Sequence, residues 1–233
     1  MPQHEYIPRS YELDHSLTQS STSIFLRCNE PGHLSVKLSF EALRPGLFRT
    51  TFTTDTHPLP PHPSVQRPPD AVTNGWHKSE SMPDKRKVIH NGDVTAMVDF
   101  SGVPKISLAF DGQDPIYTDL EHRSYVLDGP GVAHYSRYNR KTLHVGLGEK
   151  AAPMNLANRS FRIDATDSFG YDAHHTDPLY KHIPLLINAT PDGCVATFSS
   201  SHSRGSYSVG AEMDGLWGHF KVSTKEVSCE ITT

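Results

Sequence analysis

Cysteine is scarce in this chain, and its spacing fits no covalent or metal framework. Cys28, Cys194 and Cys229 are the three cysteines in 233 residues, and no two of them form a C-x-x-C pair. An odd number of distant cysteines argues against a disulfide scaffold, and a zinc site needs three or four converging ligands. We therefore expect reduced thiols, no metal ion and no cofactor.

Basic runs and long apolar runs are missing too. The formal net charge is -4, and lysine and arginine are scattered, which excludes the charge pattern of a nucleic-acid binder. No window reaches the length of a membrane span, and the first residues, MPQHEYIPRSYELDHS, lack the basic region and apolar core of a signal peptide. These absences predict a cytoplasmic protein that binds neither nucleic acid nor membranes.

The sequence also lacks any sustained helical period. Segments rich in β-branched and aromatic residues alternate with turns such as Arg44-Pro45-Gly46 and Asn91-Gly92. Many short strands at roughly even spacing predict an all-β fold, a large antiparallel β-sandwich with long loops. The predicted strands are residues 23–27, 33–40, 47–54, 87–100 as a hairpin, 105–110, 143–147, 161–165, 183–189, 194–199, 206–210 and 216–223, with further short strands up to residue 138.

Composition divides the chain into a sandwich domain with two short flanks. Residues 1–22 are predicted to be a polar N-terminal extension, and residues 224–233 a C-terminal tail. The sandwich domain is predicted over residues 23–223. Within it, residues 57–84 are rich in proline and show no apolar periodicity, which predicts a long loop.

The most informative stretch is DATDSFGYDAHHTDPLY, from Asp164 to Tyr180, where acids alternate with aromatic residues. Such a stretch can bind sugars, hold a metal ion or form an acidic surface loop. Sugar binding uses carboxylates that accept hydrogen bonds from hydroxyl groups and aromatic faces that cover the ring. Against a metal site, adjacent side chains such as His174 and His175 point in opposite directions on an extended chain. The residues alone leave the sugar-binding and surface-loop interpretations open.

A glycine-containing segment, Gly146-Leu147-Gly148-Glu149-Lys150, precedes this stretch. It contains G-x-G but lacks the third glycine and the following helix of a dinucleotide-binding loop. Its glycines are expected to permit a tight exit from a strand. Glu149 and Lys150 are then expected to leave the sheet towards solvent or towards each other.

The run from His144 to Asn188, HVGLGEKAAPMNLANRSFRIDATDSFGYDAHHTDPLYKHIPLLIN, resembles the N-terminal sandwich domain of glycoside hydrolase family 31, the α-glucosidase family. Members commonly read G-L-G-E-K, a polar spacer, N-T-D-A-x-G-Y-D and then D-P-L-Y-K-x-I-P. The resemblance implies a galactose-mutarotase-like sandwich beside a (β/α)8 barrel. One loop of such a sandwich reaches over the barrel mouth and helps to shape the substrate pocket.

By this resemblance, Asp167 corresponds to the aspartate that contacts the substrate sugar. Ala165 stands where the family usually has asparagine, so the internal hydrogen bonding of the loop is expected to differ. The implied substrate-binding residues are Asp167, Tyr171 and Asp172. The residues implied to shape the loop are Gly146, Gly148, Glu149, Gly170, Asp177 and Tyr180.

The resemblance places both catalytic carboxyl groups on the barrel, so no catalytic residue is expected here. Neither Trp76 nor Trp217 begins the family's W-x-D-M-N-E segment, and the chain is too short for eight βα units in addition to the sandwich. We therefore expect a non-catalytic carbohydrate-binding domain, truncated before the barrel. Its implied partners are an α-glucoside or oligosaccharide and the catalytic barrel.

Two alternatives stay open. The sandwich could be a structural docking domain without measurable sugar affinity of its own. It could also be a stand-alone enzyme such as a sugar epimerase, for which His134 and His144 are the available acid–base candidates.

Overall fold

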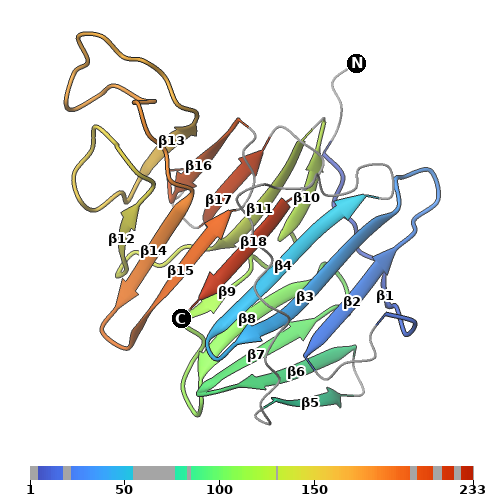
Figure 1. The fold of residues 1–233 in the computed structure, drawn as a ribbon. Coiled ribbons are helices and arrows are strands. Elements are labelled where there is room, and N and C mark those ends of the chain that lie inside the picture. Colours follow the sequence, from blue (N-terminus) through green and yellow to red (C-terminus); the bar gives the residue numbers. More distant parts are fainter. Residues whose placement is uncertain are drawn as a thin grey trace.

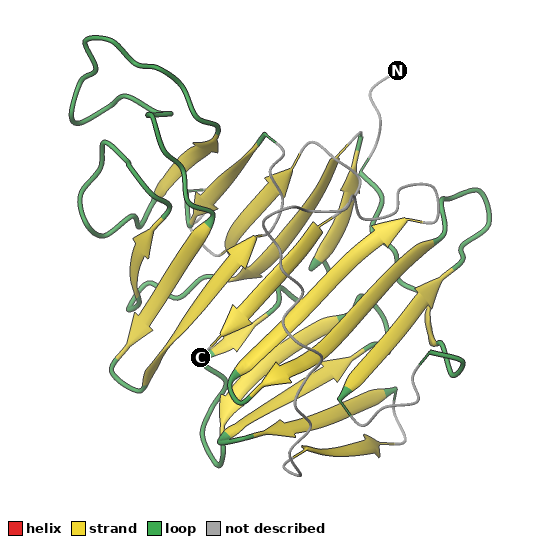
Figure 2. Ribbon diagram, in the orientation of Figure 1, coloured by secondary structure: helices red, strands yellow, loops and turns green. Residues whose placement is uncertain are grey.

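The computed structural model describes residues 5–17, 22–54, 77–82, 85–129, 131–199, 204–211, 217–222 and 227–232. Within these ranges there are strands, turns and loops but no helix, as Figure 2 shows. No helix of the described chain is therefore long and apolar enough to cross a membrane. The predicted all-β class is confirmed.

One layer of the molecule is an antiparallel sheet of eight strands, drawn at the front of Figure 1. In spatial order its strands are β1 (Tyr11–Leu13), β2 (Ser23–Cys28), β3 (Val36–Arg44), β4 (Leu47–Thr54), β18 (Val227–Thr232), β15 (Gly193–Ser199), β14 (Leu185–Thr190) and β12 (Leu143–Gly146). Strand β4 shows the period of two that places it there, because alternate residues from Phe48 to Thr54 are buried.

Two five-stranded antiparallel sheets lie behind this layer (Figure 1). The first contains β10 (Tyr125–Asp128), β11 (Gly131–Arg137), β17 (Trp217–Val222), β16 (Gly205–Val209) and β13 (Arg159–Ile163). The second contains β5 (His77–Met82), β6 (Arg86–Asn91), β7 (Val94–Asp99), β8 (Lys105–Phe110) and β9 (Tyr117–Thr118). A β-bridge between Asp119 and Ser136 connects the two. One hydrophobic cluster draws on strands of all three sheets, which defines a sandwich.

Three strands lie in ranges where the sequence predicted none. Strands β1 and β18 fall within the predicted extension and tail, yet both pair with neighbours in the large sheet. Strand β5 falls within the predicted proline-rich loop and pairs with β6. Residues 55–76 and 83–84 of that loop lie outside the described residues. The domain boundaries themselves stay predictions.

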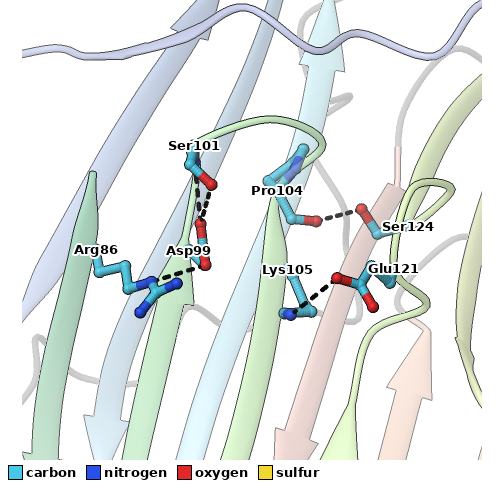
Figure 3. A network of polar contacts seen from close by, with 7 residues as sticks. All are labelled: Arg86, Asp99, Ser101, Pro104, Lys105, Glu121 and Ser124. Atoms are coloured by element: carbon cyan, nitrogen blue, oxygen red, sulfur yellow. Dashed lines mark hydrogen bonds and ion pairs between the residues drawn. The ribbon is translucent and has the colours of Figure 1, made fainter. Parts of the chain in front are cut away.

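Polar contacts fix the connection between β7 and β8 (Figure 3). The carboxylate of Asp99 accepts hydrogen bonds from the backbone N–H and the hydroxyl of Ser101, at 3.0 and 2.7 Å, and from Arg86 Nε at 2.9 Å. Beyond the turn, the hydroxyl of Ser124 donates to the carbonyl oxygen of Pro104. This bond ties the β7–β8 turn to the segment that enters β10.

The N-terminal segment is held by Glu30. Its carboxylate accepts hydrogen bonds from the backbone N–H groups of Arg9 and Ser10, at 2.9 and 2.8 Å, and from the Tyr6 hydroxyl at 2.9 Å. Desolvation acts to raise the pKa of Glu30, but these hydrogen bonds outweigh it and lower the pKa from 4.5 to about 2. Ionised Glu30 therefore stabilises the folded chain.

Candidate functional site

Two long loops project from one end of the sandwich, where β12, β13 and β14 end or begin (Figure 1). The second of them contains the stretch Asp164–Tyr180, which we call the acidic loop. The first begins with the segment Gly146–Lys150, and hydrogen bonds join that segment to the chain that follows the acidic loop. Together these segments form the candidate site.

Gly146 and Gly148 allow the two loops to approach closely. Both have positive φ, +121° and +79°, a region that favours glycine. A Cβ on Gly146 would lie 2.2 Å from the carbonyl oxygen of Leu185, and one on Gly148 would lie 2.9 Å from that of Lys181. The backbone N–H of Glu149 donates to the same Lys181 oxygen at 3.0 Å. No other residue type fits these two positions without moving the backbone.

A buried ion pair anchors the base of the acidic loop. Lys150 Nζ donates to Asp177 Oδ1 at 2.8 Å and to the carbonyl oxygen of Arg162 at 3.0 Å, and the lysine side chain is only 4% exposed. The backbone N–H of Arg162 donates to the other oxygen of Asp177 at 2.5 Å. The expectation that Lys150 points to solvent or to Glu149 was therefore wrong. The ammonium group is drawn inward because Asp177 and a β13 carbonyl provide acceptors there.

Further bonds close the neck of the loop. The backbone N–H of Thr166 donates to the carbonyl oxygen of Leu179 at 3.0 Å, and the Ser168 hydroxyl donates to that of Pro178 at 3.2 Å. The Tyr180 hydroxyl donates to the carbonyl oxygen of Ser168 at 2.7 Å. The two limbs of the loop are thus fixed side by side on both sides of Asp167.

The far end of the loop is a tight turn organised by Asp172. Its side chain accepts a hydrogen bond from the backbone N–H of His174 at 2.7 Å, and its own N–H donates to the Thr176 hydroxyl at 2.8 Å. The bond from His174 is the main reason that the pKa of Asp172 is lowered. Gly170, at φ +65°, turns the chain into this end with open space around it.

The histidines of the turn form no metal site with other groups of the described chain. The rings of His174 and His175 lie 6.3 Å apart between centroids and are tilted by 59°. No cluster of three or more His, Cys, Asp or Glu side chains that could hold a metal ion occurs among the described residues.

Asp167 differs from the other acids of the loop because its carboxylate is exposed and has no partner among the described residues. Asp177 pairs with Lys150, Asp172 caps its turn, and Asp164 lies 3.4 Å from Arg204 Nε. The two oxygens of Asp167 are therefore available to accept hydrogen bonds from an incoming molecule.

Aromatic side chains accompany this carboxylate. Phe169 is 89% exposed and Tyr171 is 52% exposed, although burial is the usual state of such rings. Sugar recognition has two components. A carboxylate accepts hydrogen bonds from the hydroxyl groups of the sugar, and aromatic rings cover its apolar C–H faces. The acidic loop presents both within a few residues.

The fold and the loop together define a class: an all-β sandwich that presents an acidic, aromatic loop on a fixed base. The family model for the glycosyl hydrolase 31 N-terminal galactose mutarotase-like domain matches residues 37–207. The chain belongs to this family, and the predicted membership is confirmed. No curated protein sequence matches the chain significantly.

Solved structures of glycoside hydrolases share the fold. A GH31 dextranase from Flavobacterium johnsoniae aligns with 97% of this chain at a TM-score of 0.76 and 14% identity, and the match covers 26% of the dextranase. The cycloalternan-forming enzyme of Listeria monocytogenes aligns with 98% at a TM-score of 0.77 and 11% identity, covering 21% of that enzyme.

The glucosidase II α subunit aligns with 97% of this chain at a TM-score of 0.71 and 14% identity, and 32% of the subunit is covered. This chain thus spans between a fifth and a third of the length of these enzymes. At such low identities the likeness shows the fold alone.

Proposed function

We propose that this chain is a non-catalytic domain that contributes a sugar-contacting loop to the active site of an α-glucosidase-like enzyme. Asp167 is the principal proposed contact, and Tyr171 and Asp172 are the further proposed contacts. The catalytic residues would reside on a (β/α)8 barrel that packs beside the sandwich. The substrate class is an α-glucoside or oligosaccharide, and the cytoplasmic location expected from the sequence belongs to the same proposal.

The observation that carries the proposal is the unpaired, exposed carboxylate of Asp167 on a loop with a fixed base. Lys150, Asp177 and the glycines at 146 and 148 hold the base, so that presenting Asp167 costs little further ordering on binding. The family supports the choice of ligand. The related structures include a dextranase complexed with isomaltotriose and a cycloalternan-forming enzyme with a pentasaccharide substrate.

A second candidate function is favoured by a different observation. Large apolar side chains are exposed on both loops, among them Met154 at 81%, Phe169 at 89% and Ile183 at 53%. Large apolar groups exposed on neighbouring loops of a domain favour a protein interface. In this alternative the loops dock on the barrel, and the chain has no measurable affinity for sugar.

Isothermal titration calorimetry with maltose and with glucose separates the two functions. The first predicts saturable binding at millimolar concentration or tighter, reduced by Asp167→Asn and unaffected by Asp114→Asn, an exposed acid in a different loop. The second predicts no heat of binding for any variant. We expect weak binding because a single loop covers only one side of a sugar.

A further inference from the structure

A cavity of about 80 Å³ lies inside the sandwich, away from the acidic loop. One wall is formed by residues on and around β9, β11 and β16, and the other by β12, β14 and β15. The lining is unusually polar for the interior of a sandwich. It includes His134 and Ser136 on one side and His144 and Asn188 on the other. Burying such groups is unfavourable unless they find hydrogen-bond partners.

Strand alternation shows which side chains of β11 face the cavity. Tyr135 packs with Val126 in a small separate cluster on the outer face of its sheet. His134 and Ser136 are its neighbours in the strand, so their side chains point inward. Arg137 shares the outer face with Tyr135. Although Arg137 touches the edge of the cavity, its charge is therefore not directed into it.

On the wall formed by β9, β11 and β16, a buried carboxylate holds His134. Its Nε2 lies 2.8 Å from Asp119 Oδ1, and the same oxygen accepts from the Tyr117 hydroxyl at 2.8 Å. The other oxygen of Asp119 accepts from the backbone N–H of Ile106 at 3.0 Å. This arrangement makes Nε2 the proton-bearing nitrogen of His134 and fills the carboxylate with donors. The hydrogen-bonding capacity of the Asp119 carboxylate is therefore used within the protein.

The opposite wall carries groups whose hydrogen-bonding capacity is incompletely used. His144 Nδ1 lies 2.6 Å from Asn188 Oδ1, and the ring of Tyr138 stacks on His144 with centroids 5.0 Å apart. The amide NH2 of Asn188 and the hydroxyls of Ser136 and Thr142 have no protein partner in the described part of the chain. Donors and acceptors thus face the cavity from both layers.

We propose that this cavity binds a small, uncharged, polyhydroxylated molecule. The unused hydroxyl and amide groups suit hydroxyl groups of a ligand, which donate and accept equally. A charged ligand would find no group free to pair with it, because the Asp119 carboxylate already accepts three hydrogen bonds and Arg137 faces outward. The cavity volume limits the size of the ligand. A cavity of about 150 Å³ holds benzene, so a cavity of about 80 Å³ suits a molecule with about three carbon atoms. Glycerol is the matching probe.

The test is a titration of the full chain followed by NMR of its 15N-labelled histidine rings. Glycerol is expected to shift the His134 and His144 signals along a saturating curve, whereas 1-propanol, of similar size with a single hydroxyl, does not. Ser136→Ala should weaken glycerol binding about fivefold, as expected for the loss of one neutral hydrogen bond. Ser160→Ala is the matched control, because Ser160 is an exposed serine of β13 that does not line the cavity.

Three outcomes would overturn the proposal: shifts that stay linear with glycerol concentration, equal responses to glycerol and 1-propanol, or equal affinities for the Ser136 and Ser160 variants. Any of these would mean that the cavity does not recognise a polyhydroxylated molecule through its polar lining. If Ser136→Ala lowers the melting temperature sharply, the comparison of glycerol with 1-propanol on the unaltered chain decides. None of these measurements depends on the acidic loop, so the proposed function can fail or succeed independently.

Discussion

Replacing Lys150 by methionine should destabilise the chain, because it removes the cation from the base of the acidic loop. Breaking a buried ion pair by deleting one partner typically costs about 3–5 kcal/mol. Here Asp177 is 20% exposed and keeps its bond from the Arg162 N–H, so part of its charge stays solvated. We therefore expect about 2–3 kcal/mol for Lys150→Met. Methionine retains the apolar stem but removes the ammonium group, which lies 5.6 Å from the centroid of the Phe161 ring.

Urea unfolding measures this cost. A loss of that size should lower the midpoint by about 1 M, whereas the exposed Lys141→Met control should stay within about 0.5 kcal/mol of the parent chain. The double variant Lys150→Met/Asp177→Leu should be more stable than the sum of the single changes predicts, because it leaves no lone charge. Strict additivity, or equal effects of the Lys150 and Lys141 variants, would refute the reasoning.

Three further predictions concern stability. Gly148→Ala should cost about 3 kcal/mol because its Cβ would meet backbone atoms, and Gly170→Ala only about 1 kcal/mol because its surroundings are open; equal costs in urea unfolding would contradict this. Because the pKa of Glu30 falls from 4.5 to about 2 on folding, its contribution is present above pH 4.5 and is lost as pH falls through about 2. In the Glu30→Gln variant the free energy of unfolding should therefore fall less steeply with decreasing pH than in the parent chain. The same slope below pH 4.5 in both proteins would exclude a contribution from ionised Glu30. Phe52 lies in the core, so Phe52→Ala should lower the free energy of unfolding by about 3–5 kcal/mol. Phe169 is exposed, so Phe169→Ala should lower it by less than about 0.5 kcal/mol. Equal melting temperatures of the two variants in thermal unfolding would contradict this.

Most of the fold could be predicted because period-two patterns and turn residues are local. The strand predicted over residues 47–54 coincides with β4. The hairpin signalled by Asn91-Gly92 joins β6 and β7, but its turn residues are Gly92 and Asp93, because Asn91 ends β6 and pairs with Val94. Strand β1 has only three residues, too few to show an alternating pattern. Strand β18 could not be predicted, since it pairs with β4, which is far away in the sequence. The same holds for β5, whose sequence, HKSESM, lacks the apolar alternation of a half-buried strand.

The acidic loop could be located from its motifs, but its internal contacts could not. The need for glycine at 146 and 148 is readable from the G-x-G spacing, whereas the identity of the close neighbours is not. The pairing of Lys150 with Asp177 joins residues 27 positions apart, which no local pattern specifies. Likewise, the sequence offered His134 and His144 as candidates without showing that they line one cavity.

The most direct test of the account is the kinetics of α-glucoside hydrolysis when this domain is combined with a cognate (β/α)8 barrel. Asp167→Ala should lower kcat/KM by about 10- to 100-fold, the effect of deleting a charged hydrogen-bond acceptor from a substrate hydroxyl. Asp114→Ala should leave kcat/KM unchanged. If Asp167→Ala hydrolyses the substrate as efficiently as the unaltered protein, the acidic loop does not contact the sugar through this residue.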